Sequence, residues 1–427
     1  MTKRTRVNGS VVLKVIFMKM IIGKPHVVAQ SAKEQLIGGG YQDPLIRCRD
    51  GKLYLRFSAR MDNFSTFGKE DGNPLFVSSD MGETWSRSYD LDDWIKASLP
   101  LSNGDRLQMC EYSTIYDFPA LPKTDDDRKN ISYCCGRRTV YTVDELMPYL
   151  GDRIAKEFAA KRIKSGNNVP VSEKCKVIWK NMDVSCFEAF DPPFIKRHFG
   201  MQYYADKNGV LWMPLSGGYV KDDGKMGSRR ACISLLRSDD NGHTWSYTGT
   251  VPYKEEYNIP NAKDVEGFLE AAVLFAGNGD IVLIMRSGSL CPYDIGDKDH
   301  PAPKMYFVRS SDGGKTWQTP EVFHDYGVFP RAVQLGCGAS LMTSGRPGVY
   351  VRASYDKNLY EWEDVTPILT VPEDEIYTGY FRYSCANNDL CVYDENTAFL
   401  AYSDFTLNDE NGDRAKSIVV RKITFEP

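Results

Sequence analysis

The second half of the chain carries charged and phenolic side chains of types that can act together on an anionic group. Glu270 begins a predicted pair of strands that ends in Arg286. Arg346 lies in a Ser-Gly-Arg-Pro-Gly turn, and Tyr383 lies in the segment Tyr-Phe-Arg-Tyr-Ser-Cys. A guanidinium can bind both oxygens of a carboxylate, and a carboxylate can accept the proton of a phenol. Because these residues are far apart along the chain, only the fold can bring them together.

A short turn sequence that occurs three times indicates what this fold is. It reads Ser-x-Asp-x-Gly-x-Thr-Trp, and its copies begin at Ser78, Ser238 and Ser310. The Asp can accept hydrogen bonds from its own turn, the Gly can take a positive φ, and the Trp can pack between sheets. A fourth copy, at Ser354, contains one extra residue. We therefore predict that these aspartates are structural and not catalytic.

Pairs of apolar runs joined by turns lie between these copies and are typical of β-hairpins. They occupy residues 44–55, 202–212, 272–284, 332–342 and 390–402. Together with the repeated turns they predict five sheets, and the less clearly patterned stretch from about Leu91 to Asp191 could hold a sixth. The sequence thus predicts an all-β fold, a six-bladed β-propeller in which residues 1–427 form a single domain.

One helical pattern interrupts the predicted strands. Thr142 is a plausible N-cap, Glu145 completes a capping box, and the apolar residues that follow share one face: Leu146, Leu150, Ile154 and Phe158. We predict a small helical insertion over about 142–165, which covers one side of the ring.

The beginning of the chain is basic and partly apolar. Lys14, Lys19 and Lys24 interrupt the apolar run, so it is too short to span a bilayer. We predict a β-strand from Val11 to Ile22, with a poor signal peptide as the alternative.

Composition excludes several classes of function. The net charge of -4 provides no basic face for nucleic acid. The five histidines lack metal-ligand spacing, so we predict that no metal and no organic cofactor is needed. The eleven cysteines are odd in number and form no CxxC pair, which favours reduced thiols in a cytoplasmic protein, with a secreted or periplasmic location as the alternative.

The repeated turn resembles the Asp-box of the exo-sialidases and trans-sialidases, and the resemblance extends from about Tyr41 to Asp404. It implies a six-bladed propeller whose central pocket binds the carboxylate of a sialic acid through three arginines. It also implies a nucleophilic tyrosine paired with a glutamate, and an aspartate that acts as acid and base.

The resemblance assigns roles to the residues named first. Glu270 resembles the glutamate partner of the tyrosine, Arg286 resembles the second arginine of the triad, and Arg346 resembles the last. Tyr383 resembles the nucleophile, with two close rivals, Tyr377 and Tyr380. A neutral phenol suits an anionic substrate, because the charge of the substrate would repel a carboxylate nucleophile.

The first arginine of the family's triad is missing. The family begins its first blade with Phe-Arg-Ile-Pro, and this chain has Gln42 where that arginine would stand. Arg60 matches an additional pocket arginine of the family, and Arg47 or Arg49 could compensate for the loss.

The acid/base aspartate has two candidates, Asp62 and then Asp71, and either could equally be a solvated loop residue. The resemblance therefore predicts an exo-glycosidase that removes a terminal sialic acid or related acidic sugar from a glycan by a retaining mechanism. A propeller glycosidase for another sugar and a glycan-binding propeller without catalysis are the alternatives.

Overall fold

The structure is a computed structural model. It describes the following residues: 2–7, 10–15, 18–31, 42–58, 74–90, 93, 99–109, 120–121, 129–132, 136–141, 143–150, 157–167, 169–178, 187–190, 195–197, 202–220, 226–257, 265–289, 304–376 and 382–426. Among these residues the regular elements are almost all strands, which confirms the prediction of an all-β protein.

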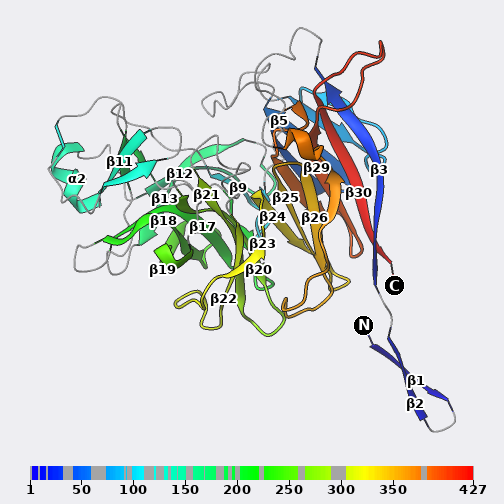
Figure 1. The fold of residues 1–427 in the computed structure, drawn as a ribbon, viewed down its shortest axis with the longest axis horizontal. Helices are drawn as coiled ribbons and strands as arrows, with labels where there is room; N and C mark the ends of the chain where they lie inside the picture. Colours follow the sequence, from blue (N-terminus) through cyan, green and yellow to red (C-terminus); the bar gives the residue numbers. More distant parts are fainter. Residues whose placement is uncertain are drawn as a thin grey trace.

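Three sheets are separate antiparallel units of four strands. Unit 1 consists of β4 (Gln42–Arg49), β5 (Lys52–Ser58), β6 (Leu75–Ser78) and β7 (Ser86–Ser88). Unit 5 consists of β24 (Val328–Gln334), β25 (Ser340–Gly345), β26 (Val349–Ser354) and β27 (Thr366–Leu369). Unit 6 consists of β28 (Asn388–Val392), β29 (Thr397–Asp404), β30 (Ser417–Glu426) and β3 (Lys19–Gln30). In unit 6 an early strand therefore completes a sheet of late strands, and Figure 1 shows β3 beside β30.

A twelve-stranded sheet contains three further units of four strands, which are joined by parallel contacts between β13 and β19 and between β18 and β20. Unit 2 consists of β8 (Leu99–Pro100), β9 (Arg106–Met109), β12 (Glu157–Ile163) and β13 (Val171–Ile178). Unit 3 consists of β16 (Tyr204–Ala205), β17 (Leu211–Val220), β18 (Met226–Ser238) and β19 (Thr244–Val251). Unit 4 consists of β20 (Val265–Phe275), β21 (Ile281–Ser289), β22 (Met305–Ser310) and β23 (Glu321–His324).

Smaller elements lie outside these units. A hairpin of β1 (Thr2–Val7) and β2 (Ser10–Val15) projects from the body (Figure 1). A second small sheet consists of β10 (Lys129–Ser132), β11 (Gly136–Tyr141), β14 (Phe187–Phe190) and β15 (Ile195–Arg197). Helix α2 (Val143–Leu150) adjoins it, and short 3-10 helices span Glu255–Tyr257 and Glu373–Glu375.

Two predicted boundaries are wrong. The helix ends at Leu150, and residues Glu157–Ile163, which we predicted to be helical, form β12. Leu146 and Leu150 are buried as the helical pattern requires, but β12 pairs with β9 and β13, and this long-range pairing overrides the local periodicity. The strand predicted from Val11 to Ile22 is likewise two strands, because β2 ends at Val15 and β3 begins at Lys19.

The repeated turns join the third and fourth strands of their units, and their aspartates are structural as predicted. In the first copy Asp80 accepts the Thr84 N–H at 3.0 Å, and the Ser78 hydroxyl accepts the Gly82 N–H at 2.9 Å. The indole of Trp85 donates to the Gly82 carbonyl at 3.1 Å. The second and third copies repeat the bonds from the N–H groups, and the glycines of all three copies have φ between +83° and +86°.

These turns also link neighbouring units. A Cβ added at Gly242, in the turn of unit 3, would overlap Leu107 of unit 2. The Gly277 N–H of unit 4 donates to Lys357 in the turn of unit 5, at 2.7 Å. Gly82 of unit 1 lies against Phe399 of unit 6. The Cys337 N–H of unit 5 donates to the Glu395 carbonyl of unit 6, and Gly314 of unit 4 packs on Leu235 of unit 3. The contacts therefore run in order from unit 2 through unit 6 to unit 1.

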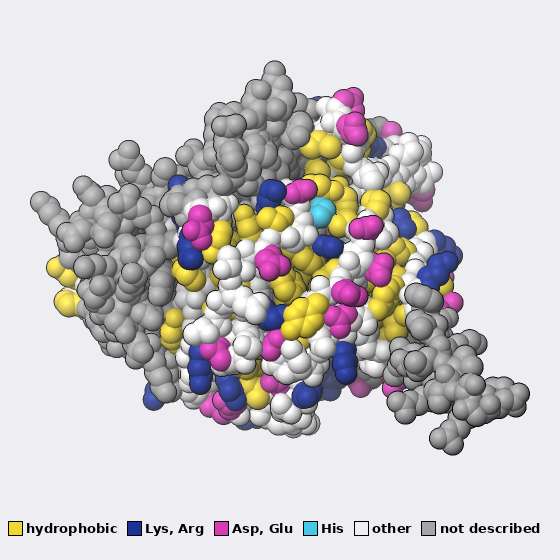
Figure 2. All heavy atoms as spheres, turned by 60° about the horizontal axis from the view of Figure 1, so that its bottom comes forward, with side chains coloured by type: hydrophobic (Ala, Val, Ile, Leu, Met, Phe, Trp, Pro, Cys, Tyr) yellow, Lys and Arg dark blue, Asp and Glu magenta, His cyan; other side chains and the backbone are white. Residues whose placement is uncertain are grey.

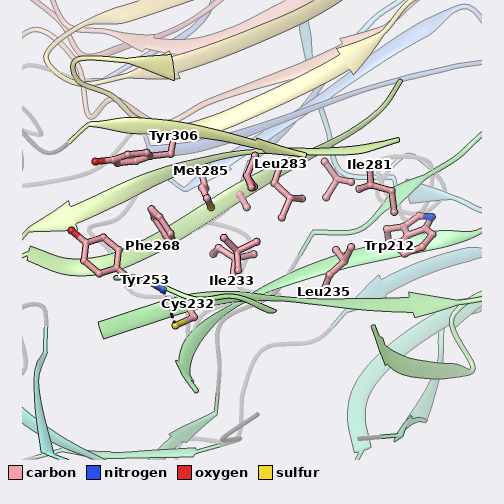
Figure 3. Packing of buried hydrophobic residues seen from close by; sticks show 14 residues of the cluster. Trp212, Cys232, Ile233, Leu235, Tyr253, Phe268, Ile281, Leu283, Met285 and Tyr306 are labelled. Atoms are coloured by element: carbon pink, nitrogen blue, oxygen red, sulfur yellow. Dashed lines mark hydrogen bonds between the residues drawn. The ribbon is translucent and has the colours of Figure 1, made fainter. Parts of the chain in front are cut away.

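Apolar side chains fill the spaces between units. Figure 3 shows one such layer, in which residues of β17 and β18 in unit 3 face residues of β20 to β22 in unit 4. At one end of this layer Phe268 contacts the edge-on rings of Tyr253 and Tyr306, at 4.9 and 5.4 Å between centroids. On the outer face shown in Figure 2, acidic and basic side chains alternate without forming a large patch of one sign.

Candidate functional site

The centre of the candidate site is an ion pair between Glu270 and Arg286. Arg286 Nε lies 2.9 Å from Glu270 Oε2, and its Nη2 donates to Oε1 at 3.2 Å. The two side chains are only 17% and 7% exposed, so this fork-like pair is largely removed from water. Glu270 is thus held in one orientation.

The backbone at Glu270 explains that orientation. The register between β20 and β21 shifts between Leu269 and Ala271, which leaves Glu270 in a β-bulge, and its φ is +37°. A bulge changes the direction of its side chain. Glu270 Oε2 accepts the backbone N–H of Phe329 at 2.9 Å, so the carboxylate links unit 4 to unit 5.

The contacts continue from Phe329 to Arg346. Phe329 also has a positive φ, +54°, and lies in a register shift of β24. Val328, which precedes Phe329 in the chain, pairs with Gly345 of β25. Arg346 is the residue directly after Gly345. The peptide between Arg346 and Pro347 is cis, and the φ of Arg346 is +59°.

Unit 6 joins the same edge through Ala386. A Cβ added at Gly345 would overlap the carbonyl of Ala386, so the two backbones pass directly against each other. Ala386 has a φ of +71° and lies two residues before β28. Units 4, 5 and 6 therefore each have a non-glycine residue of positive φ within their first strand or just before it, and strained backbone of this kind is concentrated at functional sites.

Tyr383 has different neighbours from those expected of a partner of Glu270. Its ring packs against Val371, and the Arg414 guanidinium lies 5.3 Å from the ring centroid. Desolvation and a hydrogen bond with the Glu375 carboxylate raise the pKa of the phenol. The carboxylate beside Tyr383 is therefore Glu375, whereas the oxygens of Glu270 face Arg286 and Phe329.

The other predicted site residues are only partly visible. Gln42 begins β4 and pairs with Ser58, and its side chain lies outside the description. Arg47 is bonded to Asp389, and Arg49 Nε lies 3.4 Å from Asp50. The remaining candidates lie outside the described residues: Arg60, Asp62, Asp71, Tyr377 and Tyr380.

Sequence reasoning missed Phe329, Ala386 and Asp389. No residue type marks the first two as positions of positive φ, although Pro330 follows Phe329. Asp389 offered a signal, because it directly precedes the apolar residues Leu390, Cys391 and Val392 of β28, where a buried carboxylate needs a partner. No group of metal-binding side chains occurs among the described residues.

Comparison with known proteins gives a structural match without a family. No family model and no curated protein matches the chain. A protein of unknown function from Dyadobacter fermentans is similar over 95% of this chain and 99% of its own, with 17% identity and a TM-score of 0.57. This similarity shows that the two chains share a fold over nearly their whole length.

Sialidases are also among the similar structures. The NanB sialidase from Streptococcus pneumoniae has 12% identity and a TM-score of 0.48, and covers 94% of this chain and 70% of its own. The Hadza microbial sialidase Hz136 has 14% identity and a TM-score of 0.45, and covers 90% of this chain and 66% of its own.

Within the described residues, no helix is long and apolar enough to cross a membrane.

Proposed function

We propose that the chain is a six-bladed β-propeller that binds the terminal acidic sugar of a glycan, sialic acid or a related ulosonic acid, and removes it. The six units of four strands, the contacts from unit 2 round to unit 1, and the structural role of the repeated turns support the propeller. In such a ring the first strands surround the axis, and ligands bind where their ends meet.

The observation that carries the functional proposal is the held carboxylate of Glu270. An arginine fork and a backbone N–H fix it in a bulge, directly beside the turn that carries Arg346. A fixed carboxylate can accept a proton, and Arg346 supplies a positive charge for an acidic sugar in addition to that of Arg286, which Glu270 balances.

The proposed reaction is a retaining hydrolysis that needs no metal or organic cofactor. Tyr383 attacks the anomeric carbon while Glu270 accepts the phenol proton, and an aspartate near position 62 protonates the leaving oxygen as the glycosidic bond breaks. Water then attacks the same carbon, the aspartate accepts its proton, and the released phenolate regains its proton from Glu270. Arg286 and Arg346 orient the carboxylate of the sugar. The first step requires the Tyr383 phenol to exchange Glu375 for Glu270.

The position of Tyr383 favours a second candidate, a propeller that binds a glycan without cleaving it. A phenol whose pKa is raised beside Glu375 is a poorer nucleophile than one whose proton is accepted by Glu270. Gln42 at the first arginine position favours in turn a glycosidase for a different sugar.

Aryl glycosides of sialic acid, of another ulosonic acid, of a uronic acid and of neutral sugars separate these candidates. Release from the sialoside or ulosonide supports our proposal, release only from another sugar supports the altered glycosidase, and saturable binding without release supports the binding protein. For the proposed enzyme, Tyr383→Phe lowers kcat at least about 1000-fold.

The matched control is Tyr89→Phe, because Tyr89 is 69% exposed and belongs to unit 1. This variant keeps full turnover and shows that loss of a phenol is not harmful in itself. Turnover by Tyr383→Phe equal to that of the parent protein would reject Tyr383 as the nucleophile.

A further inference from the structure

A second group of buried polar side chains lies where the first strands of the units meet, and the proposed glycan site does not use it. We call Arg47 of β4, Tyr204 of β16, Arg331 of β24 and Asp389 of β28 the axial cluster. Its four members come from units 1, 3, 5 and 6, and the Tyr204 hydroxyl also lies 3.5 Å from the carbonyl of Ala271 in unit 4.

Asp389 is already shared within the cluster. Its Oδ2 accepts the Ile46 N–H at 3.0 Å and is bonded to Arg47 Nη1 at 2.5 Å. Its Oδ1 lies 3.8 Å from Arg331 Nε, which is beyond hydrogen-bond distance. The single carboxylate thus binds Arg47 closely and Arg331 only by charge.

Arg331 is the incompletely bonded member. Its side chain is 14% exposed, and its buried Nε has no hydrogen-bond acceptor in the described structure. Its Nη1 donates to the neighbouring Pro330 carbonyl at 3.3 Å, and its guanidinium lies 4.9 Å from the ring centroid of Phe329. The ring holds the guanidinium in place, so the donor points in a fixed direction.

The charges of the cluster do not balance. It contains two guanidinium groups and one carboxylate, and a guanidinium stays charged inside proteins. Burial raises the pKa of Tyr204 to about 12, so its phenol is neutral and cannot compensate. Burial, with a smaller effect of the nearby Arg47, lowers the pKa of Arg56 of β5 to about 10, so a further guanidinium lies near Arg47.

We propose that the axial cluster binds a small monovalent anion, such as chloride or formate, between Arg331 and Arg47. Arg331 Nε donates a hydrogen bond to the anion. The anion supplies a second negative charge for the two guanidinium groups, because Asp389 supplies only one. Arg47 belongs to unit 1, Arg331 to unit 5 and Asp389 to unit 6. The bound ion therefore stabilises the contacts between these units.

Thermal unfolding at constant total ionic strength tests this site, with sodium gluconate replaced stepwise by chloride, bromide or formate. Gluconate serves as the reference anion because it is much larger than a halide or a formate ion. We expect a saturable rise in Tm of about 2 °C with at least one of the small anions. Comparison of formate with the halides identifies which kind of anion the site prefers.

Two variants separate a specific site from a general salt effect. Arg331→Met removes the donor and abolishes the anion-dependent rise in Tm. Arg237→Met is the control, because Arg237 is 42% exposed and pairs with Asp239 at the surface, so this variant keeps the rise. Equal Tm values in gluconate and in all three small anions, or an unchanged rise in Arg331→Met, would overturn the proposal.

Anomalous diffraction from crystals of the parent protein in bromide decides the question if Arg331→Met does not fold. A bromide peak within contact distance of Arg331 Nε supports the site. A peak only beside Arg346, or only on exposed residues, contradicts it.

Discussion

Glu270 offers the sharpest test of the candidate site, because substitutions there test two features separately. Loss of its carboxylate should lower the stability of the protein, and glycine should restore part of that loss because of the positive φ. Glu270→Ala leaves the 7% exposed guanidinium of Arg286 without its carboxylate and the Phe329 N–H without an acceptor. Removal of one partner of a buried ion pair destabilises a protein by about 3–5 kcal/mol. Glu270 itself is 17% exposed, so we expect about 3 kcal/mol.

Glycine at the same position reverses the usual order of stability. The φ of Glu270 is +37°, where a Cβ raises the backbone energy by about 1 kcal/mol and glycine has no such penalty. We therefore expect Glu270→Gly to be about 1 kcal/mol more stable than Glu270→Ala. Glu270→Gln keeps an acceptor for Phe329, so it should be the least destabilised of the three variants.

Urea unfolding followed by tryptophan fluorescence measures these differences. Glu321 in β23 provides the matched control, because it is an exposed strand residue without positive φ. At that position glycine should be less stable than alanine, by about 0.5–1 kcal/mol. If Glu270→Ala is more stable than Glu270→Gly, the positive φ of residue 270 is refuted. If Glu270→Ala loses less than about 1 kcal/mol, the buried pair does not hold the site as described.

Two further predictions concern the repeated turns. Gly242→Ala should destabilise the protein by about 2–4 kcal/mol in urea unfolding, because its φ is +83° and the new Cβ would overlap Leu107, whereas Gly279→Ala, at +93° with open space, should lose only about 1 kcal/mol. Equal losses would contradict the packing of the turn. Hydrogen bonds with their own turns lower the pKa values of Asp80 and Asp312 to about 2, so their contribution to stability is present above pH about 4 and is lost as the pH falls towards 2. Replacement of both by Asn should flatten the decline of Tm over this range, and parallel Tm curves would refute this.

The parts of the fold that sequence predicts are those fixed by local hydrogen bonds. The Asp80 turn is complete within eight residues, so its sequence contains every donor and acceptor that it uses. Phe158 illustrates the opposite case, because its helical spacing is overridden by pairing with Cys175 of β13. Likewise, nothing local shows that β3 pairs with β30.

The candidate site likewise has a part that the sequence predicts and a part that depends on contacts between units. Glu270 and Arg286 were predicted at the two ends of one strand pair, and the antiparallel register does bring them together. The positive φ of Phe329 depends on units 4 and 5 meeting, so no residue type announces it. Tyr383 takes its neighbours from two separate segments, Glu375 from a 3-10 helix and Arg414 from the connection between β29 and β30, which a single sequence does not reveal.

The pairing of β3 with β30 has a consequence for synthesis on the ribosome. Gln30 and Ser417, which face each other across these strands, are 387 residues apart. At the usual pace of translation, the early strand waits roughly 20–80 s before its partner exists. During that interval its hydrogen-bonding edge is open to other chains, so chaperone dependence and aggregation of nascent chains should be governed by this one segment.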